Sequence, residues 1–266
     1  MGRSGTRGLP IPDRHMVLLG FATSLGALVL VALLILRGVR CRYARRFPLF
    51  YSYLVYLFCS TVTGYVVYWT RPNYHASVYW LSYVLSIVVE FAVLAEISDH
   101  IFQPFPAIRS LGRALTIAIS LGFGAAYILP TILGSHSMQI ALLDFALRAS
   151  LTKAVILVAL LFAARHFKLN LGRNVAGLML GFSIYIGVNI ANFACVERFG
   201  SIYAGVLWFM SPMAYTLCLL VWTGALWEFA PMPRKASLAP ATGEGSEDLA
   251  LELARFNNAL SRFLNK

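Results

Sequence analysis

Hydrophobic residues in this chain of 266 gather into seven long stretches, separated by shorter polar segments. Each stretch is about 20 residues or longer, which is what an α-helix needs to cross a hydrocarbon core of about 30 Å. Within each stretch the apolar residues are continuous instead of alternating, which indicates helices and not the strands of a barrel. The stretches cover about 16–36, 48–69, 77–97, 114–134, 138–163, 175–195 and 202–227. The pattern predicts an all-α, seven-transmembrane-helix bundle.

Basic residues are distributed unevenly among the segments between these stretches. Of the 22 lysines and arginines, 15 lie in 37–46, 98–113, 164–174 and the segment after 227, whereas five lie in the N-terminal segment 1–15 and the alternate connections. Cytoplasmic loops retain Lys and Arg, so we predict an extracytoplasmic N-terminus and a cytoplasmic C-terminus in the plasma (inner) membrane. The remaining two, Arg148 and Lys153, fall inside the fifth stretch.

Composition narrows the class of protein further. With 59% hydrophobic and 12% charged residues, a soluble globular domain is excluded. The net charge of +11 follows from membrane insertion and from attraction to anionic lipid headgroups, so the lipid bilayer is the expected partner and nucleic acid is not. The four cysteines are scattered and form no disulfide or metal-binding pattern. We therefore expect neither a cofactor nor a metal.

The chain after the last stretch contains a linker and a predicted helix. Residues 228–245 are rich in Pro and Gly, and 246–265 has apolar residues at alternating spacings of four and three. This spacing predicts a cytoplasmic amphipathic helix. Such a helix lies on the membrane surface, or pairs with itself or with a cytoplasmic protein partner.

Charged residues inside the stretches are the first candidates for a functional site, because charge in the bilayer is costly and often marks function. Counted from the starts of the third and fifth stretches, Glu90 lies at a depth between those of Arg148 and Lys153, so it could meet either base. Asp144 and Arg148 are four residues apart and share a helix face, whereas Lys153 lies half a turn round from Asp144. These residues form either neutralised pairs that fix helix packing, or a buried site for a charged ligand or a proton relay.

A polar stripe in the sixth stretch supplies three more candidates, Tyr185, Asn189 and Asn192. They follow Gly177 and Gly181 at helical spacing. Small residues allow two helices to approach closely, and asparagine donates hydrogen bonds between helices. The stripe is therefore either a packing surface or the lining of a polar cavity.

Recognisable catalytic motifs are missing from the chain. It contains no Gly-x-Ser-x-Gly, no His-Glu-x-x-His and no Walker loop, so no catalytic residue is predicted. Glu96, Asp99 and His100 cluster at the end of the third stretch, and they form either a metal or pH-sensing site or a solvated helix end.

Three short segments carry a resemblance to a known family. They are the basic segment before Phe47-Pro-Leu-Phe, the run from Glu96-Ile to Phe105-Pro-Ala-Ile-Arg109-Ser-Leu-Gly112, and Arg173-Asn-Val-Ala-Gly177. Together they resemble an uncharacterised bacterial family of seven-span membrane proteins, over most of residues 14–230. The resemblance implies no activity and no catalytic residues.

These observations lead to one functional hypothesis and two alternatives. The first is a small receptor-like or sensory module with a polar site inside the bundle near Glu90, Asp144 and Arg148. The second is a secondary transporter of a small polar or charged solute that uses the same charges. The third is an intramembrane enzyme.

Overall fold

The computed structural model describes residues 14–103, 105–133, 138–166, 169, 171–199, 201–227, 255 and 258. Side chains are described for these residues except 14–21, 123–133, 138–143, 196, 197, 199 and 201–209. The predicted linker 228–245 and the predicted helix 246–265 thus lie outside the described residues. The exceptions are Arg255 and Asn258, which have helical backbone.

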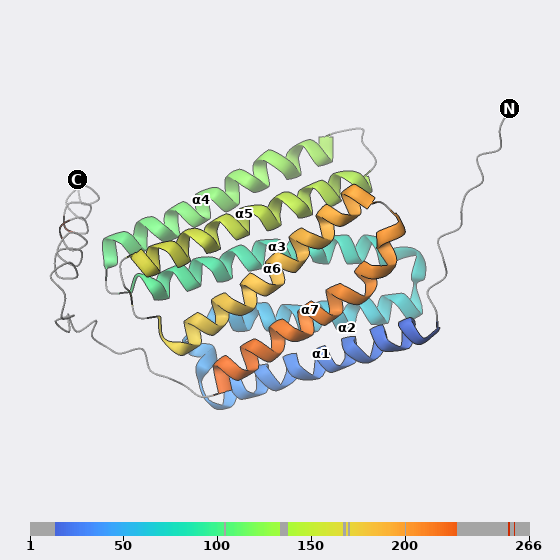
Figure 1. Ribbon diagram of the computed structural model, residues 1–266, viewed down its shortest axis with the longest axis horizontal. Coiled ribbons are helices and arrows are strands. Elements are labelled where there is room, and N and C mark those ends of the chain that lie inside the picture. The colour runs from blue at the N-terminus through green and yellow to red at the C-terminus, as the bar shows by residue number, and fades with distance from the viewer. Residues whose placement is uncertain are drawn as a thin grey trace.

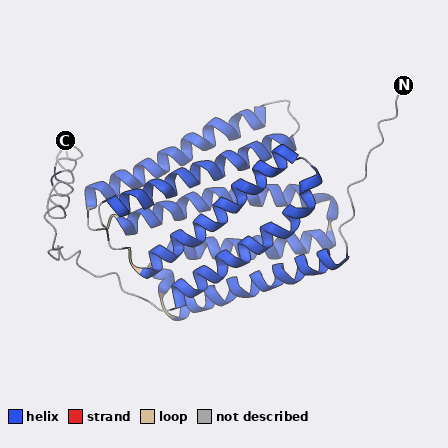
Figure 2. Cartoon of the chain, viewed as in Figure 1, coloured by secondary structure: helices blue, strands red, loops and turns tan. Residues whose placement is uncertain are grey.

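Seven helices make up the described fold, and the prediction of an all-α protein is confirmed, with no strand among the described residues (Figures 1 and 2). They are α1 (Arg14–Arg40), α2 (Pro48–Thr70), α3 (Pro72–Ile101), α4 (Pro106–Leu133), α5 (Met138–His166), α6 (Arg173–Phe199) and α7 (Ser201–Trp227), with a short 3₁₀ turn, η1 (Tyr43–Arg45), between α1 and α2.

Among the described residues, six helices contain segments long and apolar enough to cross a membrane: α1, α2, α3, α5, α6 and α7. Side chains of α4 are described only as far as Gly122. Many large apolar side chains on these helices are exposed on the outside of the bundle, Leu81 and Val155 among them. Exposed apolar surface of this extent is typical of helices that face lipid, and it indicates a multi-pass membrane protein.

Three of the helices begin at a proline, namely α2 at Pro48, α3 at Pro72 and α4 at Pro106. Proline suits the first helical position because the amide that it lacks has no intrahelical partner there. With these proline starts, α3 begins ahead of the predicted stretch 77–97, and α4 begins ahead of 114–134. Few residues separate the end of α3 at Ile101 from the start of α4 at Pro106. The tight turn between α1 and α2 includes Arg42 in the left-handed conformation, with φ of 58°.

The helices form a ring with one helix outside it (Figure 1). Around the ring, contacts run from α1 to α2, α3, α5, α6 and α7, and α7 closes back onto α1. Among the described helices, α4 contacts α3 and α5 and lies at the edge of the bundle (Figure 1). The helix α3 touches α2, α4, α5 and α6, and among the described residues it contributes more buried side chains than any other helix.

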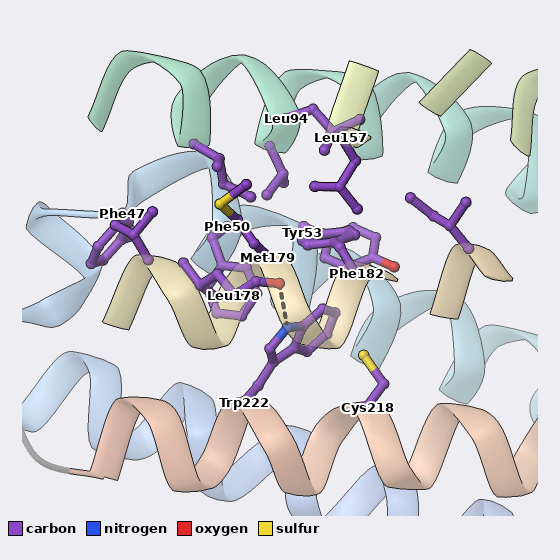
Figure 3. Close-up of a cluster of buried hydrophobic side chains, with 14 of the residues drawn as sticks. Phe47, Phe50, Tyr53, Leu94, Leu157, Leu178, Met179, Phe182, Cys218 and Trp222 are labelled. Carbon is purple, nitrogen blue, oxygen red and sulfur yellow. Dashed lines mark hydrogen bonds between the residues drawn. The ribbon is translucent and has the colours of Figure 1, made fainter. Parts of the chain in front are cut away.

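Aromatic residues fill the middle of the ring (Figure 3). Trp222 of α7 is fully buried, and its ring lies 5.0 Å from Phe182, 5.1 Å from Phe50 and 6.2 Å from Tyr53, measured between centroids. The Trp222 indole N–H donates a hydrogen bond of 3.3 Å to the Leu178 carbonyl (Figure 3). This cluster joins α2, α6 and α7 in one core.

Close contact between α6 and α7 depends on glycine. A Cβ atom at Gly177 would lie 2.0 Å from the Cβ of Ala225, and one at Gly181 would lie 2.2 Å from Nε1 of Trp222. The predicted close approach at these glycines is confirmed. The Asn174 amide donates to the Ala225 carbonyl at 2.9 Å, in the same contact.

We expect Gly177→Ala to lower the free energy of unfolding by about 1–3 kcal/mol, because the added methyl group forces α6 and α7 apart. Adding Ala225→Gly should restore much of this loss, since it removes the atom that clashes. Detergent unfolding followed by circular dichroism measures both variants. Strictly additive effects of the two substitutions would contradict this description of the contact.

Candidate functional site

An acid–base pair lies inside the bundle, between α3 and α5. The Lys153 ammonium donates to Oε2 of Glu90, and each side chain is only 2% exposed. Glu90 lies on the buried side of α3, together with Ile87 and Phe91, and Lys153 shares the inner face of α5 with Ala149 and Ile156. Lys153 therefore buries both its aliphatic stem and its charge.

Tyrosines from several helices surround this pair. The Tyr53 hydroxyl of α2 donates to Oε1 of Glu90 at 3.4 Å, so each carboxylate oxygen has a donor. The hydroxyl groups of Tyr83, Tyr185 and Tyr215 also lie within electrostatic range of the Glu90 carboxylate. Side chains from α2, α3 and α5 thus meet at one buried charge pair, and tyrosines of α6 and α7 interact with it at longer range.

Burial of two charges opposes folding, since the desolvation of each ion costs several kcal/mol. Their mutual attraction offsets this cost when the geometry is close and the remaining polar atoms are bonded. Two apolar residues of similar volume would satisfy packing at least as well. A buried pair of this kind is thus weak evidence for stability alone and, inside a membrane, a candidate for function.

Asp144 and Arg148 form a second, separate pair. The Arg148 Nε donates to Oδ1 of Asp144 at 2.8 Å, the intrahelical contact that their spacing predicts. Their side chains are 50% and 49% exposed, whereas Lys153 faces the interior. At about 100° per residue, Lys153 lies roughly 180° round the helix from Asp144. The base that Glu90 meets is therefore Lys153, and Arg148 lies on another face of α5.

The polar stripe of α6 faces α7. The Asn192 amide donates to the Ser211 hydroxyl at 2.9 Å, and the rings of Tyr185 and Tyr215 lie 6.3 Å apart. The Asn189 side chain interacts with the Tyr185 hydroxyl. These contacts hold α6 against α7, and Tyr185 connects the stripe to the surroundings of Glu90.

Sequence reasoning missed the role of Glu96. Its carboxylate accepts the backbone N–H groups of Leu49 at 3.0 Å and Phe50 at 2.8 Å, in the first turn of α2. Phe47, at the N-cap, offers no capping side chain, so Glu96 of α3 satisfies amides that would otherwise be unpaired. Glu96 is only 6% exposed, and the interpretation of this residue as part of a solvated helix end is wrong.

The neighbours of Glu96 also have partners. Asp99 pairs with Arg109 at 3.2 Å, and the His100 ring stacks on Phe47 with centroids 4.5 Å apart. Within the part of the chain that the structure describes, no three His, Cys, Asp or Glu side chains are grouped to hold a metal ion.

We expect Glu96→Leu to lower the free energy of unfolding by about 1–3 kcal/mol, because two amides at the α2 N-terminus, one buried and one partly buried, lose their acceptor. Detergent unfolding monitored by circular dichroism provides the measurement. Asp99→Asn is the control, since its partner Arg109 is half exposed and such pairs contribute about 1 kcal/mol or less. Equal losses in the two variants would contradict the capping role.

The fold and the buried pair define a class: a multi-pass helical membrane protein with an acid–base pair in its interior. Comparison of the chain with protein-family models, with curated proteins and with solved structures finds no match.

Proposed function

We propose that this chain is a seven-span, receptor-like sensory protein of the plasma membrane, whose response element is the buried Glu90–Lys153 pair. The observation that carries the proposal is the complete burial of both charges between α3 and α5. A ligand or proton that neutralises one partner leaves the other unpaired. Such a change favours a different arrangement of the two helices, which is how a local electrostatic event becomes a conformational signal.

The other candidate residues differ in how close they lie to the Glu90–Lys153 pair. Tyr185 lies within electrostatic range of Glu90 and is proposed to contact the ligand, with Asn189 positioning its hydroxyl. Asn192 extends the polar surface toward Ser211 of α7. Asp144 and Arg148 lie on the outward face of α5 and are left out of the intrabundle site.

The proposed orientation has the N-terminus outside and the C-terminus in the cytoplasm. It is supported by the distribution of charge over the bundle, which we describe by its basic end: the end where α1, α3, α5 and α7 finish. Described residues at the basic end include Arg37, Arg40, Arg42, Arg45, Arg46, Arg109, Arg113, Arg165 and Arg173, against Arg14, Arg71 and Arg198 at the other end. The positive-inside rule makes the basic end cytoplasmic.

Thiol labelling of intact cells tests the orientation. Cys41 is exposed at the basic end and should resist a membrane-impermeant maleimide, while Cys195, near the opposite end of α6, should react. Cys41→Ser and Cys195→Ser identify the labelled site. Rapid labelling of Cys41 from outside would reverse the orientation.

Continuous helices favour a receptor over a transporter. Many secondary transporters bind substrate where membrane helices are interrupted at mid-depth. Around the buried pair, α2, α3 and α5 continue as single helices, and α7 continues through Pro212. Cytoplasmic output is proposed to pass through the basic end and the tail at 246–265, to a protein partner.

Native mass spectrometry of the protein, extracted with mild detergent, tests the intrabundle site. We expect the wild type to release a bound small polar or charged molecule, and Glu90→Gln/Lys153→Met to have lost it. Asp144→Asn/Arg148→Gln is the matched control, because it removes a charge pair from the same helix outside the bundle. A wild type without a bound molecule, or equal loss in both double variants, would contradict the site.

Flux measurement separates the receptor from the transporter. In liposomes loaded with a pH-sensitive dye, under an imposed pH gradient and potential, a receptor admits no more protons than protein-free liposomes. Proton flux that is present in the wild type and absent in Glu90→Gln would contradict the receptor function and support the transporter function.

A further inference from the structure

The outward face of α5 carries a charged pair at a depth where lipid is the default neighbour. The helix has 29 residues and is about 43 Å long, against a hydrocarbon core of about 30 Å. With α5 centred in the bilayer, Arg148 lies about 6 Å and Asp144 about 12 Å from the midplane, both within the half-thickness of about 15 Å. Side chains that are half exposed there would face hydrocarbon, which is costly even for a neutralised pair.

These two residues begin a longer exposed stripe with a heptad-like repeat. Going along α5, exposed residues follow at alternating spacings of four and three, and we call this set the α5 stripe: Asp144, Arg148, Leu151, Val155, Val158 and Phe162. Leu151 is 45% exposed, and Val155 and Phe162 are each 69% exposed. Alternating four and three spacing keeps one face of a helix against a parallel partner helix.

We propose that the α5 stripe is the interface of a parallel homodimer, in which α5 of one copy packs against α5 of a second copy. A two-fold axis along the membrane normal places identical residues at the same depth. Each Arg148 then reaches diagonally toward the partner's Asp144 as well as pairing with its own, so the four charges sum to zero and are removed from lipid. The charges are self-complementary, which commits the surface to a second copy of this chain.

At the basic end of the bundle, the α5 stripe borders a groove that a second α5 could contact. This groove, of about 420 Å³, is lined in part by Val158, Phe162 and Arg165. An apolar side chain of a second α5 would fill part of this groove, as knobs fill holes between parallel helices. The dimer is independent of the proposed ligand site, because the α5 stripe is on the opposite face from Lys153.

Reconstituted liposomes that contain only this chain test the proposal. In a Cys41→Ser/Cys59→Ser/Cys195→Ser background, we expect Val155→Cys to form a disulfide-linked dimer under mild oxidation. Leu180→Cys, at an exposed position on α6, is the control that should stay monomeric. Single-molecule photobleaching should count two subunits in the wild type, and Asp144→Asn/Arg148→Gln should dimerise about tenfold more weakly.

Exchanging the charges distinguishes an interface between two copies from a pair that only stabilises its own helix, because only an interface makes the oligomeric state depend on which variants are mixed. Asp144→Arg and Arg148→Asp should each be monomeric alone, because each homodimer would then bring four charges of one sign together, and a mixture of the two should form the neutral heterodimer. Where either variant fails to insert, the neutral double variant still decides. A wild type that is monomeric at all protein densities, or a dimer undiminished by the neutral double variant, would overturn the proposal. Linkage of Val155→Cys to a different protein in native membranes would do so too.

Discussion

Lys153→Ala is expected to lower the free energy of unfolding by about 3–5 kcal/mol, because it leaves the Glu90 carboxylate buried without its counter-ion. Glu90→Ala should cost a similar amount, by leaving the Lys153 ammonium unpaired. Unfolding by sodium dodecyl sulfate, followed by circular dichroism in mixed micelles, measures the change.

The double variant Glu90→Gln/Lys153→Met separates the cost of a lone charge from the value of the pair. We expect it to be within about 1–2 kcal/mol of the wild type, since no unpaired charge remains. Asp99→Asn serves as the single control, because its partner Arg109 is half exposed near the end of the bundle and such pairs contribute about 1 kcal/mol or less. A double variant as unstable as Lys153→Ala would contradict the interpretation of the loss as a desolvated single charge.

Trp222→Ala should also destabilise the bundle by about 3–5 kcal/mol, because it leaves a large cavity where α2, α6 and α7 meet. Trp222→Phe keeps much of the aromatic contact and loses the hydrogen bond to the Leu178 carbonyl, so a smaller loss of about 1–2 kcal/mol is expected. The same unfolding titration applies.

Trp69→Ala is the control for the loss of an indole ring as such. Trp69 is 77% exposed, and its replacement should change stability by about 0.5 kcal/mol or less. Similar effects at Trp69 and Trp222 would mean that the core around Trp222 is not tightly packed.

Local features were predictable from the sequence because they depend on residues close together in the chain. The Asp144–Arg148 contact follows from a spacing of four residues on one helix, and the start of α2 at Pro48 agrees with the predicted stretch 48–69. The close approach at Gly177 and Gly181 was also predictable as a property of small residues.

Contacts between distant segments were not predictable in the same way. Depth counting left Glu90 with two possible bases, and the choice of Lys153 depends on how α5 is rotated against α3. Glu96 caps α2 by accepting from Leu49 and Phe50, which lie 47 and 46 positions earlier in the chain. No sequence motif predicts this contact. The only indication of this contact was indirect: α2 begins at Pro48, and Phe47 before it has no capping side chain, so the first amides of α2 need an acceptor from elsewhere.

By itself, the sequence determined that the described chain is helical and apolar enough to be a multi-pass membrane protein. Hydrophobic length and continuity are properties of each segment taken alone, and burial in lipid requires backbone hydrogen bonds to be satisfied within the segment. The tertiary structure decided which charges are interior and which are outside. That choice depends on the rotation of each helix about its own axis, which is set by packing against neighbours far away in the chain. On α5, this rotation buries Lys153 against Glu90 and leaves Asp144 and Arg148 exposed on the opposite face.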